Sequence, residues 1–267
     1  TFIDCNFTNN KAKGNGGGLA VETVKPFTID GCTFNNNNAK LGGAIFIESA
    51  QGNYNAEYGI ITKCKFNNNV ATSENGTILH ITNSLDTRIE MDGSNTITNQ
   101  GERGSTIYSQ CGNLILTNLL FDFKSANNAQ KDFRAARLAE RSSTRFDNCR
   151  FIGTGFTQDT TSNGYAILAE TDTKSVICDG CTFTNCGNNP SKYVIDSNSS
   201  ELQFISSQIS FTNTQASCAG IIVNRWCKFT VTDSTFKDIY ATGALNGGGI
   251  HYNSYRKGNK LNCDVSL

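Results

Sequence analysis

The chain has 267 residues, a formal net charge of zero and 17% charged residues. A neutral chain lacks the basic surplus that phosphate binding needs, which argues against nucleic acid as the main partner. No apolar run approaches 18 residues, so the sequence predicts no membrane-spanning helix. The 25 glycines, 2 prolines and abundant asparagine favour an all-β repeat protein with many turns.

The first residues, TFIDCNF, already fit the repeating unit of the chain, and no signal peptide is visible in the sequence. The unit is clearest in residues 32–48, which read CTFNNNNAKLGGAIFIE. A Cys-x-Phe strand is followed by an asparagine turn, a glycine pair and an apolar strand. Such a unit is too small to bury its own apolar face, so copies must stack.

An apolar residue, usually Phe, stands before the polar turn of each unit, at spacings of about 24 to 32 residues. This spacing is typical of a solenoid. Units four and five depart from the pattern, and residues 130–141, rich in helix formers, predict a short outer helix or an irregular turn. We call the apolar residue before the polar turn of each unit its ladder mark. The expected ladder marks are Phe7, Phe34, Phe66, Ile97, Phe121, Phe151, Phe183, Phe211 and Phe236.

The unit predicts an all-β, single-stranded parallel β-helix of about nine coils. Residues 1–267 would form one continuous domain that is a fragment of a longer chain. Equivalent residues of successive coils would stack about 4.8 Å apart. The residues expected in these structural ladders are Cys5, Phe7, Asn10, Cys32, Phe34, Asn37, Cys64, Phe66, Asn69, Cys149, Phe151, Cys181 and Phe183.

The motif FxxN followed by GGAI resembles the repeats of the chlamydial polymorphic outer-membrane proteins and of some large protist surface proteins. FxxN occurs at Phe7–Asn10, Phe34–Asn37 and Phe66–Asn69, and GGAI is complete at residues 42–45. The resemblance is clear over about the first 80 residues. It implies a right-handed parallel β-helix displayed outside the cell, with a role in adhesion.

The cysteines allow several interpretations. Those of the Cys-x-Phe motifs would be buried thiols that serve as small core residues, or disulfides between neighbouring coils. Cys178, Cys181 and Cys186 resemble half of a zinc site, but they also suit a local disulfide or free thiols. Cys218 and Cys227 are further candidates for bridging.

Four glutamates follow the apolar strands of their units, at Glu22, Glu48, Glu140 and Glu170. They would hold calcium only as a carboxylate ladder, and a solvated strand end is the favoured interpretation. His80 and His251 lie too far apart in the stack to share a site, so each is expected to be a surface or packed residue.

Five arginines cluster at Arg134, Arg137, Arg141, Arg145 and Arg150. They suit an acidic glycan or a neighbouring protein, or else form a solvated outer face. Sequons for N-glycosylation occur at Asn6, Asn75 and Asn198. We expect Asn6 to lie beside core residues, so Asn75 and Asn198 are the candidates for glycosylation.

Parallel β-helices serve adhesion and structure, or they cleave polysaccharides. The cleaving enzymes need clustered carboxylates, and the chain has no Asp-Asp and no Gly-His-Gly motif. We therefore expect a non-catalytic rod without cofactor or metal, extracellular or at the cell surface. Its partners would be further coils or other chains on the open ends, and glycans. The alternative is a lyase or hydrolase resembling pectate lyase or polygalacturonase.

Overall fold

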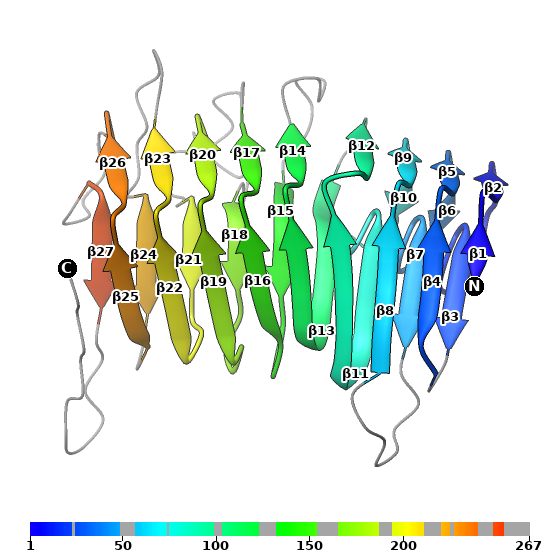
Figure 1. Cartoon of the computed structure of the whole chain (residues 1–267), viewed down its shortest axis with the longest axis horizontal. Coiled ribbons are helices and arrows are strands. Elements are labelled where there is room, and N and C mark those ends of the chain that lie inside the picture. The colour runs from blue at the N-terminus through cyan, green and yellow to red at the C-terminus, as the bar shows by residue number, and fades with distance from the viewer. Residues whose placement is uncertain are drawn as a thin grey trace.

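The structure, a computed structural model, describes residues 1–22, 25–48, 57–73, 75–98, 103–122, 132–153, 165–186, 194–210, 220–224, 227–239 and 248–253. Every regular element within these ranges is a β-strand, and the strand pairs are parallel. Figure 1 shows the strands stacked side by side from the N-terminus to the C-terminus. The all-β parallel β-solenoid is therefore confirmed, whereas its right-handedness and its coil number stay predictions.

Each coil contributes a strand to a ladder that we call the leading ladder. Its strands are joined in register from one coil to the next. They are β1 (Phe2–Ile3), β4 (Phe27–Asp30), β8 (Glu57–Thr62), the second halves of β11 (Leu79–Asp92) and β13 (Arg103–Thr117), β16 (Ser143–Asp147), β19 (Ser175–Asp179), β22 (Glu201–Ile205) and β25 (Lys228–Thr232).

A second ladder, the glycine ladder, contains the strands that follow the glycine turns. The long strands β11 and β13 pass from this ladder into the leading ladder without a break, which joins the two into one 16-stranded sheet. Its other members are β3 (Leu19–Glu22), β7 (Ile45–Glu48), β15 (Asp132–Leu138), β18 (Tyr165–Ala169), β21 (Ile195–Ser197), β24 (Ile221–Asn224) and β27 (Ile250–Asn253).

The third ladder, the short-strand ladder, carries the Phe of each coil, or Ile in β12 and β23. It is divided into a four-stranded and a five-stranded sheet. The first contains β2 (Asn6–Thr8), β5 (Thr33–Asn35), β9 (Lys65–Asn67) and β12 (Thr96–Thr98), and the second contains β14 (Leu120–Asp122), β17 (Arg150–Ile152), β20 (Thr182–Thr184), β23 (Gln208–Ser210) and β26 (Thr235–Lys237). A further pair, β6 (Asn38–Ala39) and β10 (Val70–Ala71), follows the asparagine turns of the early coils.

The core runs along the axis of the stack because alternate residues of each strand point inward. The short-strand ladder places Phe on Phe at the same position of successive coils. The leading ladder builds a parallel column of mixed apolar residues from strands in register. That column contains Ile29, Ile61, Met91, Leu116, Phe146, Cys178, Phe204 and Val231.

The short outer helix or irregular turn predicted for residues 130–141 is wrong for residues 132–138. Residues Asp132–Leu138 form strand β15, which pairs with β13 on one side and β18 on the other. Ala136 and Leu138 are fully buried in that position. Backbone pairing with two neighbouring coils therefore overrides the helix propensity of this segment.

The ladder mark predicted at Phe211 is also wrong. The residue in register with Phe183 and Phe236 is Ile209, which is buried in β23. Phe211 itself lies outside the described residues. The pattern fails here because an Ile fills the Phe position, and a Phe two residues later imitates the motif.

Truncation of one ring in the Phe column tests the packing. Phe34 is fully buried between the rings of Phe7 and Phe66, so Phe34→Ala should lower the free energy of unfolding by about 3–5 kcal/mol. Urea unfolding followed by circular dichroism measures the loss. Thr33→Ala, on the outward side of the same strand, is the control and should cost less than about 0.5 kcal/mol. Equal costs for the two variants would contradict the assigned register.

Candidate functional site

The Phe column is the first of three side-chain columns formed by the repeat residues. Phe34 lies between Phe7 and Phe66, with ring centroids 4.8 and 5.2 Å apart and nearly parallel planes. The same arrangement recurs in later coils, where the rings of Phe151 and Phe183 lie 4.4 Å apart. Stacking of equivalent rings fixes the register between coils and excludes water from the corner.

The second column is formed by the last residue of FxxN. The Asn37 amide Nδ2 donates to the carbonyl oxygen of Phe7 at 2.8 Å and to Oδ1 of Asn69 at 3.0 Å. Its own Oδ1 accepts from the backbone and side-chain amides of Asn10. Asn37 and Asn69 are fully buried, so each amide satisfies polar groups of two coils where the backbone turns.

The residues beside this column explain the rest of the motif. Asn36 has a φ of 56°, a left-handed conformation that asparagine tolerates. Gly42 has a φ of 63°, and a Cβ on Gly43 would lie 2.6 Å from the carbonyl oxygen of Thr77. The glycine pair is therefore required by a left-handed turn followed by a close approach between coils.

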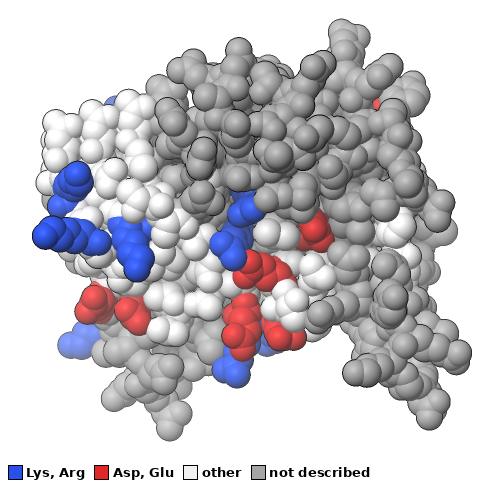
Figure 2. Space-filling view, turned by 180° about the vertical axis from the view of Figure 1, so that it is seen from behind, with Lys and Arg blue, Asp and Glu red and all other residues white. Residues whose placement is uncertain are grey.

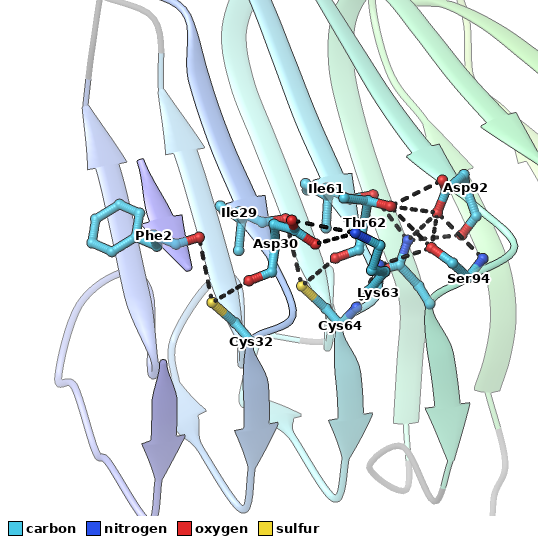
Figure 3. Close-up of polar contacts among 11 residues, drawn as sticks. Phe2, Ile29, Asp30, Cys32, Ile61, Thr62, Lys63, Cys64, Asp92 and Ser94 are labelled. Carbon is cyan, nitrogen blue, oxygen red and sulfur yellow. Dashed lines mark hydrogen bonds and ion pairs between the residues drawn. The ribbon is translucent and has the colours of Figure 1, made fainter. Parts of the chain in front are cut away.

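The third column holds the residue two positions before Phe. The Cys64 thiol donates to the carbonyl oxygens of Thr62 at 3.2 Å and of Ile29, in the preceding coil, at 3.6 Å. Cys32 donates in the same way to Asp30 and Phe2 (Figure 3). Each thiol thus caps a carbonyl of its own coil and one of its neighbour.

Three further members of this column were not predicted from the sequence, because only cysteine was expected at this position. Asn95 donates from Nδ2 to the carbonyl oxygens of Asp92 and Ile61, at 2.7 and 2.9 Å. Ser207 and Ser234 donate their hydroxyls to equivalent carbonyls. Each of these residues stands two positions before the Phe or Ile of the short-strand ladder, and this spacing could have revealed them. What they share with cysteine is a short side chain that donates a hydrogen bond.

Burial makes three of the described thiols unsuitable as nucleophiles. It raises the pKa of Cys64, Cys111 and Cys186 to about 12. A thiol with such a pKa is protonated at neutral pH, and only the thiolate attacks electrophiles or binds metal. Among the predicted ladder cysteines, Cys32, Cys64 and Cys149 are buried and donate to backbone carbonyl oxygens.

The described cysteines are free thiols in the structure, namely Cys5, Cys32, Cys64, Cys111, Cys149, Cys178, Cys181, Cys186 and Cys227. No metal-binding group of three or more His, Cys, Asp or Glu occurs among the described residues. Cys178, Cys186 and Cys227 are thus unbridged in the structure, disulfides at these positions stay a prediction, and Cys218 lies outside the described residues.

The positions of two of these cysteines give the physical reason. Cys178 belongs to the apolar column of the leading ladder, in register with Phe146 and Phe204. Cys186 takes the place of the FxxN asparagine, three residues after Phe183, and its thiol donates to the carbonyl oxygen of Phe151 at 3.4 Å. The two residues thus serve different columns of the stack.

His80 lies in a fourth stack, on the outward side of the glycine ladder. Its ring lies between those of Phe46 and Tyr108, at 5.4 and 4.4 Å, and the Arg137 guanidinium covers the far face of Tyr108 at 5.7 Å. Burial lowers the pKa of His80 to about 4, and the Arg137 charge acts in the same direction. His80 is therefore a neutral packed residue at pH 7, as expected.

The arginines do not form one free basic cluster. Arg145 contacts Asp147 and Asp179, each at 2.7 Å, and Arg137 donates to Oε1 of Glu170 at 2.6 Å. Arg141 pairs with Glu140 at 3.6 Å. Glu22 and Glu48 are in register on adjacent coils. Carboxylates thus neutralise Arg137, Arg141 and Arg145, as on a solvated outer face.

The three sequons differ in exposure. Asn6 and Thr8 are both exposed on the outward side of β2, so the expectation that Asn6 lies beside the core is wrong. Strand alternation points Asn6 outward although its neighbours Cys5 and Phe7 pack inward. Asn75 and Asn198 are half-buried, and Asn75 Oδ1 accepts from Arg137 at 2.8 Å. Glycosylation of Asn75 and Asn198 stays a prediction.

Comparison with known families identifies the repeat. Residues 4–22 and 31–48 match the Chlamydia polymorphic membrane protein repeat. The two matches cover the Cys, Phe, Asn and Gly-Gly positions of the first two coils, and the chain is thus a β-solenoid that carries this repeat. No curated protein and no solved structure matches the chain. No described helix is long and apolar enough to cross a membrane.

The asparagine column predicts a large effect from a nearly isosteric change. Asn37→Asp removes the amide donor to Phe7 and Asn69 and places a charge in a buried site, so it should lower the free energy of unfolding by at least about 3 kcal/mol at pH 7. Urea unfolding is again the measurement.

The control for this change is Asn35→Asp. Asn35 is half-buried, and its Oδ1 accepts a hydrogen bond from the Asn67 side-chain amide at 3.0 Å. An aspartate retains that acceptor, so the loss should stay below about 1 kcal/mol. Similar losses for both variants would show that the column does not depend on the donor of Asn37.

The depressed pKa of His80 predicts acid sensitivity. The unfolded chain binds this proton with a pKa of about 6.5 and the folded chain with a pKa of about 4. The unfolded state therefore gains protons first as the pH falls, and stability is lost between about pH 6.5 and 4. At pH 5 this residue should cost about 2 kcal/mol relative to pH 7.5.

The variant His80→Phe keeps the ring stack and removes the titrating group. When the pH is lowered from 7.5 to 5, the variant should become more stable relative to the wild-type chain by about 2 kcal/mol of unfolding free energy. Urea unfolding at the two pH values measures it. A difference that does not change with pH would contradict the assigned protonation state.

Proposed function

We propose that the chain is a non-catalytic rod of a cell-surface or extracellular protein, serving adhesion or as a structural part of a filament. The observation that carries the proposal is the use made of the repeat residues. The Cys, Phe, Asn and Gly positions face the inside of the stack or its corners and hold one coil to the next. A frame that needs only internal residues leaves the outer positions free to vary.

The outward positions of the short-strand ladder do vary. The residue before the ladder Phe is Asn6, Thr33, Lys65 or Arg150 in different coils, while the Phe after it is retained. A rigid scaffold with a variable exterior suits recognition. The name of the matched repeat, polymorphic membrane protein, supports a surface location for this chain.

The contacts also favour a binding rod over an enzyme. Asp147 and Asp179 are adjacent carboxylates of the leading ladder, but Arg145 bridges them at 2.7 Å. Glycoside cleavage needs two carboxyl groups that flank the substrate, one of them protonated. A pair held by a guanidinium is not available for that role.

We further propose that additional coils or another chain stack on the edge formed by β1, β2 and β3. Each of these strands pairs with the next coil on one side. Phe7 stacks on Phe34 through one face, and Ile3 is 59% exposed. Unpaired strand edges are templates for pairing with another chain, and native proteins blunt or cover them.

Surface labelling of intact source cells tests the location. A membrane-impermeant amine reagent should modify exposed lysines such as Lys11, Lys13 and Lys40 before lysis, as read by peptide mass spectrometry. The control is a cytoplasmic protein of the same cells, which should be labelled only after lysis. Labelling of this chain only after lysis would overturn the surface assignment.

A further inference from the structure

Three lysines gather on the outer surface of the first two coils. Ala39 and Ala71 are in register and buried, and Ala12 precedes them in the same column, joined to the second coil by its backbone amide. Lys13 and Lys40 each follow the alanine of their coil, and Lys11 precedes Ala12. Because alternate residues face outward, all three lysines point into solvent, and all three are exposed.

These three lysines, the lysine patch, are not neutralised within the described part of the chain. By contrast, Lys63, Lys228 and Lys237 lie at ion-pair distance from a carboxylate. Their partners are Asp30, Glu201 and Asp238. No described carboxylate lies within 4.0 Å of the lysine patch. In Figure 2, where the N-terminal coils lie at the left, blue side chains gather there, with red ones directly below them.

The placement carries an electrostatic cost. Lys13 and Lys40 occupy corresponding positions of adjacent coils, and the backbone amide of Lys40 bonds to the carbonyl oxygen of Gly14 at 2.8 Å. Like charges on neighbouring strands repel. A bound anion relieves that repulsion, and in a chain of zero net charge the patch is a local positive field.

We propose that the lysine patch binds an acidic polysaccharide, a linear glycan that carries carboxylate or sulfate groups. The inference rests on the surface function proposed above and names the class of ligand. Two features of the described residues favour a glycan over other polyanions. The exposed large apolar side chains of the described residues are Ile3 and Leu120, on β1 and β14, and neither belongs to the segments that carry the patch and could insert into a lipid surface beside it.

The second feature concerns nucleic acid. Single-stranded nucleic acid is bound by aromatic rings on which bases stack, beside a basic groove. The ring of Phe7 in the first coil faces Phe34, and Phe34 is fully buried. Three ammonium groups without exposed rings suit the spaced charges of a polysaccharide, with contact by charge alone and therefore with strong dependence on salt.

The test measures binding of the purified chain to immobilised heparin and to polygalacturonate at 50 mM NaCl by surface plasmon resonance, with neutral dextran as reference. The triple variant Lys11→Gln, Lys13→Gln, Lys40→Gln should bind at least one of the two acidic glycans about tenfold more weakly than the wild-type chain. Binding of the wild-type chain should disappear at 500 mM NaCl.

The matched control removes charge from paired lysines, Lys228→Gln and Lys237→Gln, and should leave binding within about twofold. Circular dichroism verifies that both variants fold. Equal binding by the triple variant, or failure of the wild-type chain to bind either glycan, would overturn the proposal. So would tighter binding to anionic phosphatidylserine vesicles or to single-stranded RNA. These outcomes leave surface labelling unaffected, so they separate the ligand from the location.

Discussion

The fold depends on hydrogen bonds between side chains and backbone at the corners where one coil meets the next. Strand ladders satisfy the backbone along the flat faces, but each corner leaves carbonyl and amide groups without a ladder partner. Asn37 and Cys64 supply the missing partners, reaching the carbonyl oxygens of Phe7 and Ile29 in the preceding coils. A buried polar group without such a partner costs more than the bond itself gains, so these columns decide whether coils stack.

This constraint explains which residues the repeat retains. The corner accepts cysteine, asparagine or serine because each has a short side chain that donates. Leu119 shows a second solution, an apolar residue that is buried at the equivalent position before Phe121. The Phe rings close the corner from inside, and the outward residues have no part in the frame. Frame and surface are therefore separate sets of residues, as a display scaffold requires.

Much of this arrangement could be predicted from the sequence, because its determinants are local and repeated. The columns through Phe34, Asn37 and Cys64 follow from a period of about 29 residues and strand alternation. Features that depend on a neighbouring coil could not be predicted. β15 is a strand because two other strands pair with it, and Ile209 replaces Phe where Phe211 imitates the motif. For Cys186 a zinc site, a disulfide and a free thiol all stayed open, because its spacing hid its place in the asparagine column.

The outer surface is the part that sequence reasoning described least well. The arginine-rich segment was predicted as a possible binding site, yet two of its arginines have carboxylate partners from the next coil, Glu170 for Arg137 and Asp179 for Arg145. The lysine patch has few charged neighbours in sequence and becomes a patch only when two coils stack. Ionic interactions of this kind are set by the three-dimensional arrangement, and they fall off within a Debye length.

Amide hydrogen exchange of single residues, measured by NMR, tests the central claim most directly. The backbone amides of Asn37 and Cys64 donate to side-chain oxygens of the next coil, Asn69 Oδ1 at 3.1 Å and Asn95 Oδ1 at 2.9 Å. The account predicts that both amides exchange as slowly as amides inside the strand ladders. Exchange at the rate of an exposed turn would contradict it, because the corners would then not be held by the neighbouring coil.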